Sequence, residues 1–222
     1  MRRITLLSVA ISLLATVTAP AADLQSMVVG IGHDELVVAS GIPYTSGRWG
    51  TDYLALSHLL GLGKQYTVTT DGMIFDEAEP ITACSRFWHG IDLVVLRVKT
   101  HAWRPVFRFG RLSDLKPDDK LLLLPYRGIQ QTPEEITFRH HRLDQYAATN
   151  SLEWRNTMVA KGNWRPGFSG APWVRKGLVY GLHKGEGTVL SEGKEQHVIL
   201  AEPQPRIAQC LERVGYKFLI PK

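Results

Sequence analysis

Short runs of apolar or alternating residues, separated by glycines and prolines, constrain the fold of this chain more than any other feature. They are rich in β-branched and aromatic residues, which favour strands. The runs lie at residues 35–39, 53–57, 65–70, 92–98, 120–125, 136–141, 171–174, 178–183 and 196–201. Many short strands at regular spacing are typical of antiparallel barrels or of a β-sandwich. The sequence therefore predicts an all-β fold.

One helix is predicted, near the end of the chain. Pro203 and Pro205 precede a set of apolar residues at helical spacing, and Gly215 is placed to end the helix. The apolar positions are Ile207, Ala208, Leu211 and Val214. The chain has 222 residues, of which 44% are hydrophobic, so we expect one domain or two tightly packed subdomains.

The first residues predict export. Arg2 and Arg3 precede an apolar run at residues 4–17, and the small residues 19–21 offer a cleavage site. The run is too short for a stable membrane span. We interpret residues 1–22 as a signal peptide and expect a periplasmic or extracellular protein, with no stable membrane insertion after cleavage. The alternative is a membrane anchor that is not cleaved.

The charge of the chain argues against nucleic acid as a partner. The formal net charge of +5 is mild and is spread along the sequence, whereas nucleic-acid binding needs a clustered basic face. The densest basic spot, His140, His141 and Arg142, is explained by a solvated strand end. Adjacent histidines on a strand point to opposite faces, which disfavours a shared metal. We expect no metal and no cofactor.

Cys84 and Cys210 are the two cysteines of the chain. In an oxidising compartment they would form one disulfide. The alternative is that both are isolated, buried apolar residues. Their sequence positions leave both readings open, because pairing depends on a separation that the sequence does not give.

Three separated segments carry residue types that suit nucleophilic chemistry. Ser169 lies between Gly167 and Gly170, which allow a sharp turn with unshielded amide N–H groups. A serine hydroxyl becomes a good nucleophile only when a base takes its proton. His58, at the end of an apolar strand, is the candidate base, and Asp92, which opens another, is the carboxylate that would orient it. The polar stretch 110–119 separates the first two from Ser169, so we expect a cleft between two halves.

Together and in this order, LALSH (residues 54–58), IDLVVL (91–96) and GFSGAP (167–172) resemble the chymotrypsin-fold serine proteases of bacteria. The chain is similar to HtrA protease domains and to glutamyl endopeptidases over about residues 27–215. The resemblance implies two six-stranded antiparallel β-barrels with a C-terminal α-helix, the first within residues 23–110 and the second within 111–222. Together they would form one trypsin-like peptidase domain acting on proteins or peptides.

The resemblance also implies a role for each residue. Ser169 would be the nucleophile, His58 the general base and Asp92 the residue that orients it. The amides of Gly167 and Ser169 would form the oxyanion hole. Trypsin-like zymogens carry an aspartate just before the nucleophile, and Phe168 stands there instead. We therefore expect an oxyanion hole that forms without N-terminal insertion.

Specificity is predicted from two further segments. Asn163 stands where trypsin has its acidic pocket floor, so cleavage after Lys or Arg is not supported. Residues 178–185, with His183 and Lys184, resemble a strand of glutamyl endopeptidases whose histidine contacts a Glu or Gln side chain. Trp164 stands where those enzymes usually have a threonine. We take Asn163, Trp164, His183 and Lys184 as substrate-binding candidates and His183 as the basis of a Glu or Gln preference.

A second class of function uses the same fold without chemistry. A catalytically silent trypsin-like fold would act as a protein-binding module, and a blocked cleft would not show in the sequence. An α/β-hydrolase is disfavoured, because it expects Gly-X-Ser-X-Gly followed by an acid and a histidine, and Ala171 replaces the last glycine.

Overall fold

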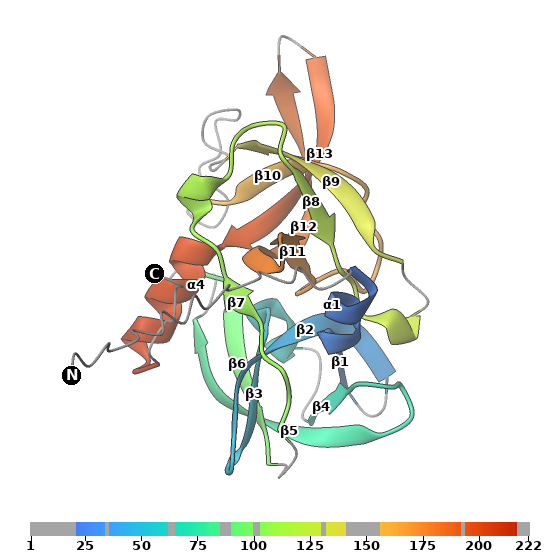
Figure 1. Cartoon of the computed structure of the whole chain (residues 1–222), viewed down its shortest axis with the longest axis vertical. Coiled ribbons are helices and arrows are strands. Elements are labelled where there is room, and N and C mark those ends of the chain that lie inside the picture. The colour runs from blue at the N-terminus through green and yellow to red at the C-terminus, as the bar shows by residue number, and fades with distance from the viewer. Residues whose placement is uncertain are drawn as a thin grey trace, which may run out of the picture.

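Two β-barrels lie one above the other in the computed structural model, with a helix against their side (Figure 1). The structure describes residues 21–33, 36–61, 65–84, 90–99, 103–129, 132–140, 156–191 and 194–216. The predicted signal peptide falls almost wholly on residues 1–20, outside these ranges. Within them, no helix has both the length and the apolar character needed to cross a bilayer.

The N-terminal barrel is closed and antiparallel, with strand order β1-β2-β3-β6-β5-β4. Its strands are β1 (Val29–His33), β2 (Leu36–Gly47), β3 (Gly50–Ala55), β4 (Tyr66–Thr69), β5 (Phe75–Cys84) and β6 (Leu93–Val98). Two short helices precede or interrupt it, α1 (Ala21–Met27) and the 3₁₀ turn η1 (Ser57–Gly61). Side chains such as Ile31, Leu54 and Val95 fill its interior, where they are fully buried.

The C-terminal barrel has strand order β11-β8-β9-β10-β13-β12 and is closed by pairing of β11 with β12. Its strands are β8 (Lys120–Leu123), β9 (Glu134–His140), β10 (Met158–Lys161), β11 (Pro172–Arg175), β12 (Leu178–Ser191) and β13 (Lys194–Pro203). The two-residue strand β7 (Arg108–Phe109) adds to β12 in parallel. Two 3₁₀ turns, η2 (Leu112–Asp114) and η3 (Arg127–Ile129), lie in the connections. The predicted pair of six-stranded antiparallel barrels is confirmed.

Helix α4 (Gln204–Arg213) confirms the predicted C-terminal helix and ends as predicted. Pro203 is extended before its first turn, and Gly215 adopts a φ of +84° just after it. That left-handed conformation suits glycine and lets the Tyr216 N–H donate to the Leu211 carbonyl at 2.9 Å, which satisfies an otherwise free carbonyl.

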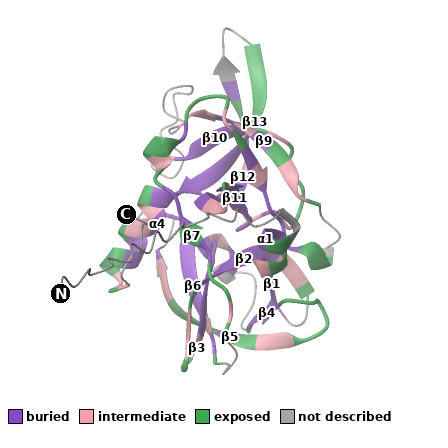
Figure 2. Cartoon of the chain, in the orientation of Figure 1, coloured by how far each residue is buried: buried purple, intermediate pink, exposed green. Residues whose placement is uncertain are grey.

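The cores explain how the barrels are held together. The C-terminal barrel has its own cluster around Phe138 and Trp173. The cluster of the N-terminal barrel continues across the junction, to Leu182 of β12 and to Ile207 and Leu211 of α4. Burying each such aliphatic side chain is worth about 1.5–3 kcal/mol. Helix α4 therefore follows the last strand of one barrel but packs on the core of the other (Figure 2).

A disulfide joins Cys84, the last residue of β5, to Cys210 of α4 across 126 residues of sequence. It adds a covalent link between the helix and the N-terminal barrel.

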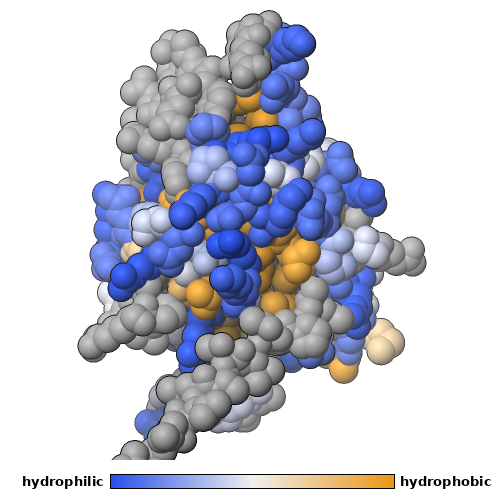
Figure 3. Space-filling view, turned by 45° about the horizontal axis from the view of Figure 1, so that its top comes forward, coloured by the Kyte–Doolittle hydropathy of each residue, from blue (hydrophilic) through white to orange (hydrophobic). Residues whose placement is uncertain are grey.

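The face of the molecule in Figure 3 is mostly hydrophilic, with hydrophobic atoms visible in gaps near its centre. This distribution agrees with apolar side chains that are largely inside the two barrels.

Candidate active site

His58 and Asp92 meet because strand β3 ends next to the point where its neighbour, strand β6, begins. His58 lies in η1, just after β3, and Asp92 lies just before β6. The two strands are antiparallel neighbours with Ala55 opposite Val94, which brings the flanking residues together. The Nδ1 atom of His58 is 2.7 Å from Oδ2 of Asp92. A carboxylate can only accept, so the ring donates from Nδ1 and leaves Nε2 with a free lone pair.

Asp92 is held in this position by further donors. Its side chain is 1% exposed, whereas that of His58 is 24% exposed and can reach solvent or a substrate. Oδ1 of Asp92 accepts the Ser57 hydroxyl at 2.7 Å and the His58 N–H at 2.8 Å. Burial alone would raise the pKa of the Asp92 carboxyl. The hydrogen bond and charge of His58, with the Ser57 hydroxyl and the His58 N–H, outweigh it and lower the pKa.

Ser169 lies in a turn that is fastened to both barrels. Its carbonyl accepts the Ser40 N–H of β2 at 2.8 Å, and the Gly170 N–H donates to the His183 carbonyl of β12 at 2.8 Å. Gly170 has a φ of +82°, and a Cβ there would collide with the Ser40 carbonyl, so the close approach requires glycine. Among the described residues, no hydrogen bond joins the Ser169 hydroxyl to the His58 ring.

The backbone just before Ser169 leaves two amides without backbone partners. Gly167 has a φ of +89°, and its carbonyl accepts the Ser40 hydroxyl at 3.0 Å. The Phe168 N–H closes a turn onto the Arg165 carbonyl at 3.2 Å. Within the described part of the chain, the N–H groups of Gly167 and Ser169 donate no backbone hydrogen bond. Two free amides at this spacing are what an oxyanion hole needs.

His183 lies directly behind this turn and is fully buried. Its ring contacts Phe168 edge-on, with centroids 6.0 Å apart, and Trp173 at 6.3 Å. Neither ring nitrogen has a hydrogen-bond partner among the residues that the structure describes. Burial lowers the pKa of His183 to about 3, so the ring is neutral at physiological pH.

The other specificity candidates differ in burial from one another. Asn163 and Trp164 are exposed on the segment between β10 and β11, and the Asn163 N–H donates to Glu134. The Lys184 ammonium is buried and lies 3.4 Å from the Glu202 carboxylate. Phe168, 1% exposed, packs inward with the core of the C-terminal barrel.

The sequence analysis missed three residues that contact this site. Ser40 bonds to the Ser169 turn through its backbone, and its hydroxyl both donates to Gly167 and accepts the Tyr126 N–H. Glu202 accepts the Asp92 N–H, and Arg206 pairs with Glu202. The i,i+4 spacing of Glu202 and Arg206 at a strand–helix junction was the available signal, but it does not reveal the contact with Asp92.

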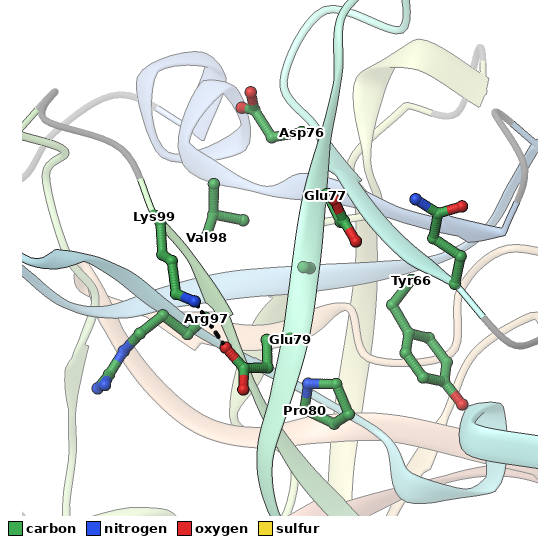
Figure 4. Close-up of a pocket in the computed structure, with 10 residues that line it drawn as sticks. Tyr66, Asp76, Glu77, Glu79, Pro80, Arg97, Val98 and Lys99 are labelled. Carbon is green, nitrogen blue, oxygen red and sulfur yellow. Dashed lines mark ion pairs between the residues drawn. The ribbon is translucent and has the colours of Figure 1, made fainter.

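A pocket of about 630 Å³ lies elsewhere, on the N-terminal barrel over β5 and β6 (Figure 4). Both acidic and basic side chains line this pocket, and the Lys99 ammonium lies 3.1 Å from the Glu79 carboxylate. Neither His58, Asp92 nor Ser169 belongs to its wall. In the described ranges, no cluster of three or more His, Cys, Asp or Glu side chains could hold a metal ion.

Comparison with known proteins identifies the class of fold. No protein-family model matches the chain, and no curated protein sequence is a significant match. The active form of the Rv3671c protease from M. tuberculosis is similar, with 17% identity, a TM-score of 0.68 and coverage of 100% of this chain and 95% of that one. The MamO protease domain from Magnetospirillum magneticum has 16% identity and a TM-score of 0.62, covering 87% and 98%.

The HtrA-type protease AlgW with a tripeptide is also similar, with 16% identity and a TM-score of 0.66, covering 89% of this chain and 65% of that one. At these identities the likeness establishes the fold. The chain has the chymotrypsin-like fold, and the structures that resemble it are bacterial serine proteases. The resemblance predicted from the three sequence segments is thus confirmed at the level of the fold.

Proposed function

We propose that this chain is a serine endopeptidase that cleaves peptide bonds through an acyl-enzyme. The main support is the 2.7 Å contact between His58 and the buried Asp92, beside a junction where the Ser169 turn is bound to β2. Strand β2 pairs with β3, the strand that leads to His58. Nucleophile, base and orienting acid thus belong to connected elements.

In the proposed reaction, His58 takes the Ser169 proton at Nε2 as the hydroxyl oxygen attacks the scissile carbonyl. Asp92 holds Nδ1–H and stabilises the imidazolium that forms. The ring then gives the proton to the leaving amine as the C–N bond breaks. Water then attacks the acyl carbonyl and gives its proton to His58. The ring passes that proton to the Ser169 oxygen as the ester bond breaks, which releases the acid product and restores the enzyme. The lowered pKa of Asp92 keeps its carboxylate ionised throughout.

The amides of Gly167 and Ser169 would stabilise the tetrahedral intermediate. Both lack backbone acceptors among the described residues, so both N–H groups are available to a developing oxyanion. Loss of one such donor lowers kcat about 10²- to 10³-fold in other serine proteases. Gly167 has a φ of +89°, and in this proposal that backbone conformation would point its amide into the hole without N-terminal insertion.

We also propose a preference for Glu or Gln before the scissile bond, through His183. A neutral imidazole carries one donor and one acceptor, and leaving a buried polar group unpaired costs about 1–3 kcal/mol. The ring lies next to the Ser169 turn, since it contacts Phe168 and the Gly170 N–H donates to the backbone carbonyl of His183. The ring is fully buried, so it would have to become accessible before a substrate carboxylate or amide could supply the missing partner. Asn163 and Trp164 would flank the entrance.

A peptide-library digest tests this preference. Wild type should favour Glu or Gln, and His183→Ala should lose that selectivity while still cleaving. Trp164→Ala, which alters the exposed rim, serves as the control and should change KM more than selectivity. The same preference in wild type and His183→Ala would contradict the assignment.

Export and an oxidising location belong to the proposal as well. The Cys84–Cys210 disulfide is compatible with a periplasmic or extracellular protein, because such bonds persist in oxidising compartments. Protein or peptide substrates in that compartment follow from the proposed activity. N-terminal sequencing of the secreted product would test cleavage after residue 21 or 22.

One observation favours the alternative of a silent binding module: the Ser169 hydroxyl and the His58 ring share no hydrogen bond among the described residues. Catalytic hydrogen bonds are often long before substrate binds, so the enzyme is compatible with the same geometry. A fluorophosphonate probe separates the two functions. Labelling that disappears in Ser169→Ala supports the enzyme, and a folded wild type that is not labelled supports the binder.

A further inference from the structure

A buried network of charges lies directly behind Asp92. The Glu202 side chain is 1% exposed and accepts three donors: the Asp92 N–H at 3.1 Å, the Arg206 Nε–H at 2.9 Å and the Lys184 ammonium at 3.4 Å. Arg206 also donates to the Gly90 carbonyl. With Glu202 negative and both Lys184 and Arg206 positive, the group carries one net positive charge.

Such a network is a poor source of stability. Removing charges from water costs several kcal/mol per ion, and well-packed apolar residues of similar volume often stabilise a protein as well or better. What distinguishes this network is its place. It bridges the end of β13 and the first turn of α4 to the three-residue segment that carries Asp92.

That segment is held at both ends. Arg206 bonds to the carbonyl of Gly90, which has a φ of +62°, and Glu202 bonds to the N–H of Asp92. The next residue, Leu93, pairs with Cys84, whose disulfide again leads to α4. The backbone just before Asp92 is thus fixed by groups from the C-terminal part of the chain. The Asp92 side chain, in contrast, faces Ser57 and His58 in the N-terminal barrel.

We propose that Glu202 and Arg206 are positioning residues that set the orientation of Asp92 toward His58 from across the barrel junction. The inference rests on the proposed protease function, because it gives Asp92 its role. Neither residue would touch substrate. By fixing the Asp92 backbone, they keep one carboxylate oxygen on the His58 ring and the other on Ser57.

Arg206→Met is the decisive variant, because two effects on the His58 pKa then have opposite signs. The charged and titratable groups around Asp92 are His58 from η1, Lys184 from β12, Glu202 from β13 and Arg206 from α4. Loss of a positive charge alone would raise the His58 pKa. Loss of the Asp92 contact would lower it, because the imidazolium loses its partner.

We expect Arg206→Met to lower the His58 pKa and to reduce kcat about tenfold with little change in KM. Arg206→Lys, which can still donate to Gly90, should recover part of both losses. Glu202→Gln is the second variant: all three partners of Glu202 are donors, so an amide NH₂ would face a donor and release the segment. It should shift the His58 pKa in the same direction.

The His58 pKa is measured by NMR titration in a Ser169→Ala background, which does not depend on activity. Arg97→Met, which breaks the ion pair with Asp52 at 2.7 Å in the N-terminal barrel, is the control and should lower Tm without moving that pKa. An unchanged or raised His58 pKa in folded Arg206→Met would overturn the positioning role. Failure of wild type to react with a fluorophosphonate would instead refute the protease proposal, so the two failures are distinguishable.

Discussion

The Ser57 hydroxyl donates to the Asp92 carboxylate at 2.7 Å, on the oxygen that does not face the His58 ring. The chain places this donor immediately before His58. The two carboxylate oxygens are therefore bound separately, one by the ring and the other by Ser57 and the His58 N–H. This arrangement leaves Asp92 little freedom to rotate.

Ser57→Ala tests how much this donor contributes. The variant should lower kcat/KM roughly three- to tenfold and destabilise the fold by about 1–3 kcal/mol, because a buried charged acceptor loses a hydrogen bond. The measurements are steady-state kinetics and urea unfolding. Ser46→Ala, which removes a hydroxyl that bonds to Thr51 in the β2–β3 hairpin, is the matched control and should leave kcat/KM unchanged. Equal effects of both variants on kcat/KM would exclude a specific role for Ser57.

The burial of His183 predicts an acid-sensitive fold. Its folded-state pKa of about 3 lies below the ordinary value of 6.5, so between these values the unfolded chain binds more protons than the folded one. Stability should therefore fall as pH decreases through that window, by on the order of a few kcal/mol at about 1.4 kcal/mol per pKa unit. Replacing the ring by an apolar side chain should remove this contribution.

His183→Leu should accordingly be as stable as wild type or more stable at pH 7, and should lose less stability between pH 6.5 and pH 3.5. Urea unfolding at intervals of half a pH unit gives both curves. Trp173→Phe alters the same cluster without a titrating group and should shift stability by a similar amount at every pH. Parallel curves for wild type and His183→Leu would mean that His183 does not remain neutral in the folded state.

Local patterns were sufficient to predict most of the fold. The runs at residues 92–98 and 120–125 formed β6 and β8. The first is rich in β-branched valine, and the second is a short apolar run that ends at a proline. Strand β5 was not predicted. Its sequence contains Asp76, Glu77 and Pro80, and its pairing with β6 shifts register near that proline. Tertiary pairing, rather than local preference, makes this segment a strand.

The residues of the candidate site likewise fall into two groups, those that the sequence predicts and those that it does not. Residues that react must have particular chemical types in a particular order, which made His58, Asp92 and Ser169 predictable as candidates. Residues that act through contacts do not show in the sequence. Glu202 lies 110 residues from Asp92, and their hydrogen bond depends on how β13 and β6 meet. The complete burial of His183 was equally hidden, because a strand residue faces core or solvent according to packing.

Removal of the disulfide should destabilise the protein without removing its activity at low temperature. A link across 126 residues lowers the conformational entropy of the unfolded chain, which raises the free energy of unfolding by about 4–5 kcal/mol in the loop-entropy description. The Cys84→Ser/Cys210→Ser double variant should show a much lower midpoint in urea, and reductant should shift wild type to the same midpoint. A double variant as stable as oxidised wild type would show that α4 is held by packing alone.

Gly170 gives the sharpest test of how the Ser169 turn is fixed. Gly170→Ala suffers two penalties: a φ of +82°, which costs an L-residue about 1–2 kcal/mol, and a Cβ that meets the Ser40 carbonyl. Gly177→Ala is the matched control, since its φ of +77° is similar but no atom lies within 4 Å of the added Cβ. Gly177→Ala should lose only the conformational part and keep its activity. Gly170→Ala should lose more stability and, because the turn must move away from β2, at least about tenfold in kcat. Urea unfolding and fluorophosphonate labelling rates measure both effects, and equal losses in the two variants would contradict the close approach of the turn to Ser40.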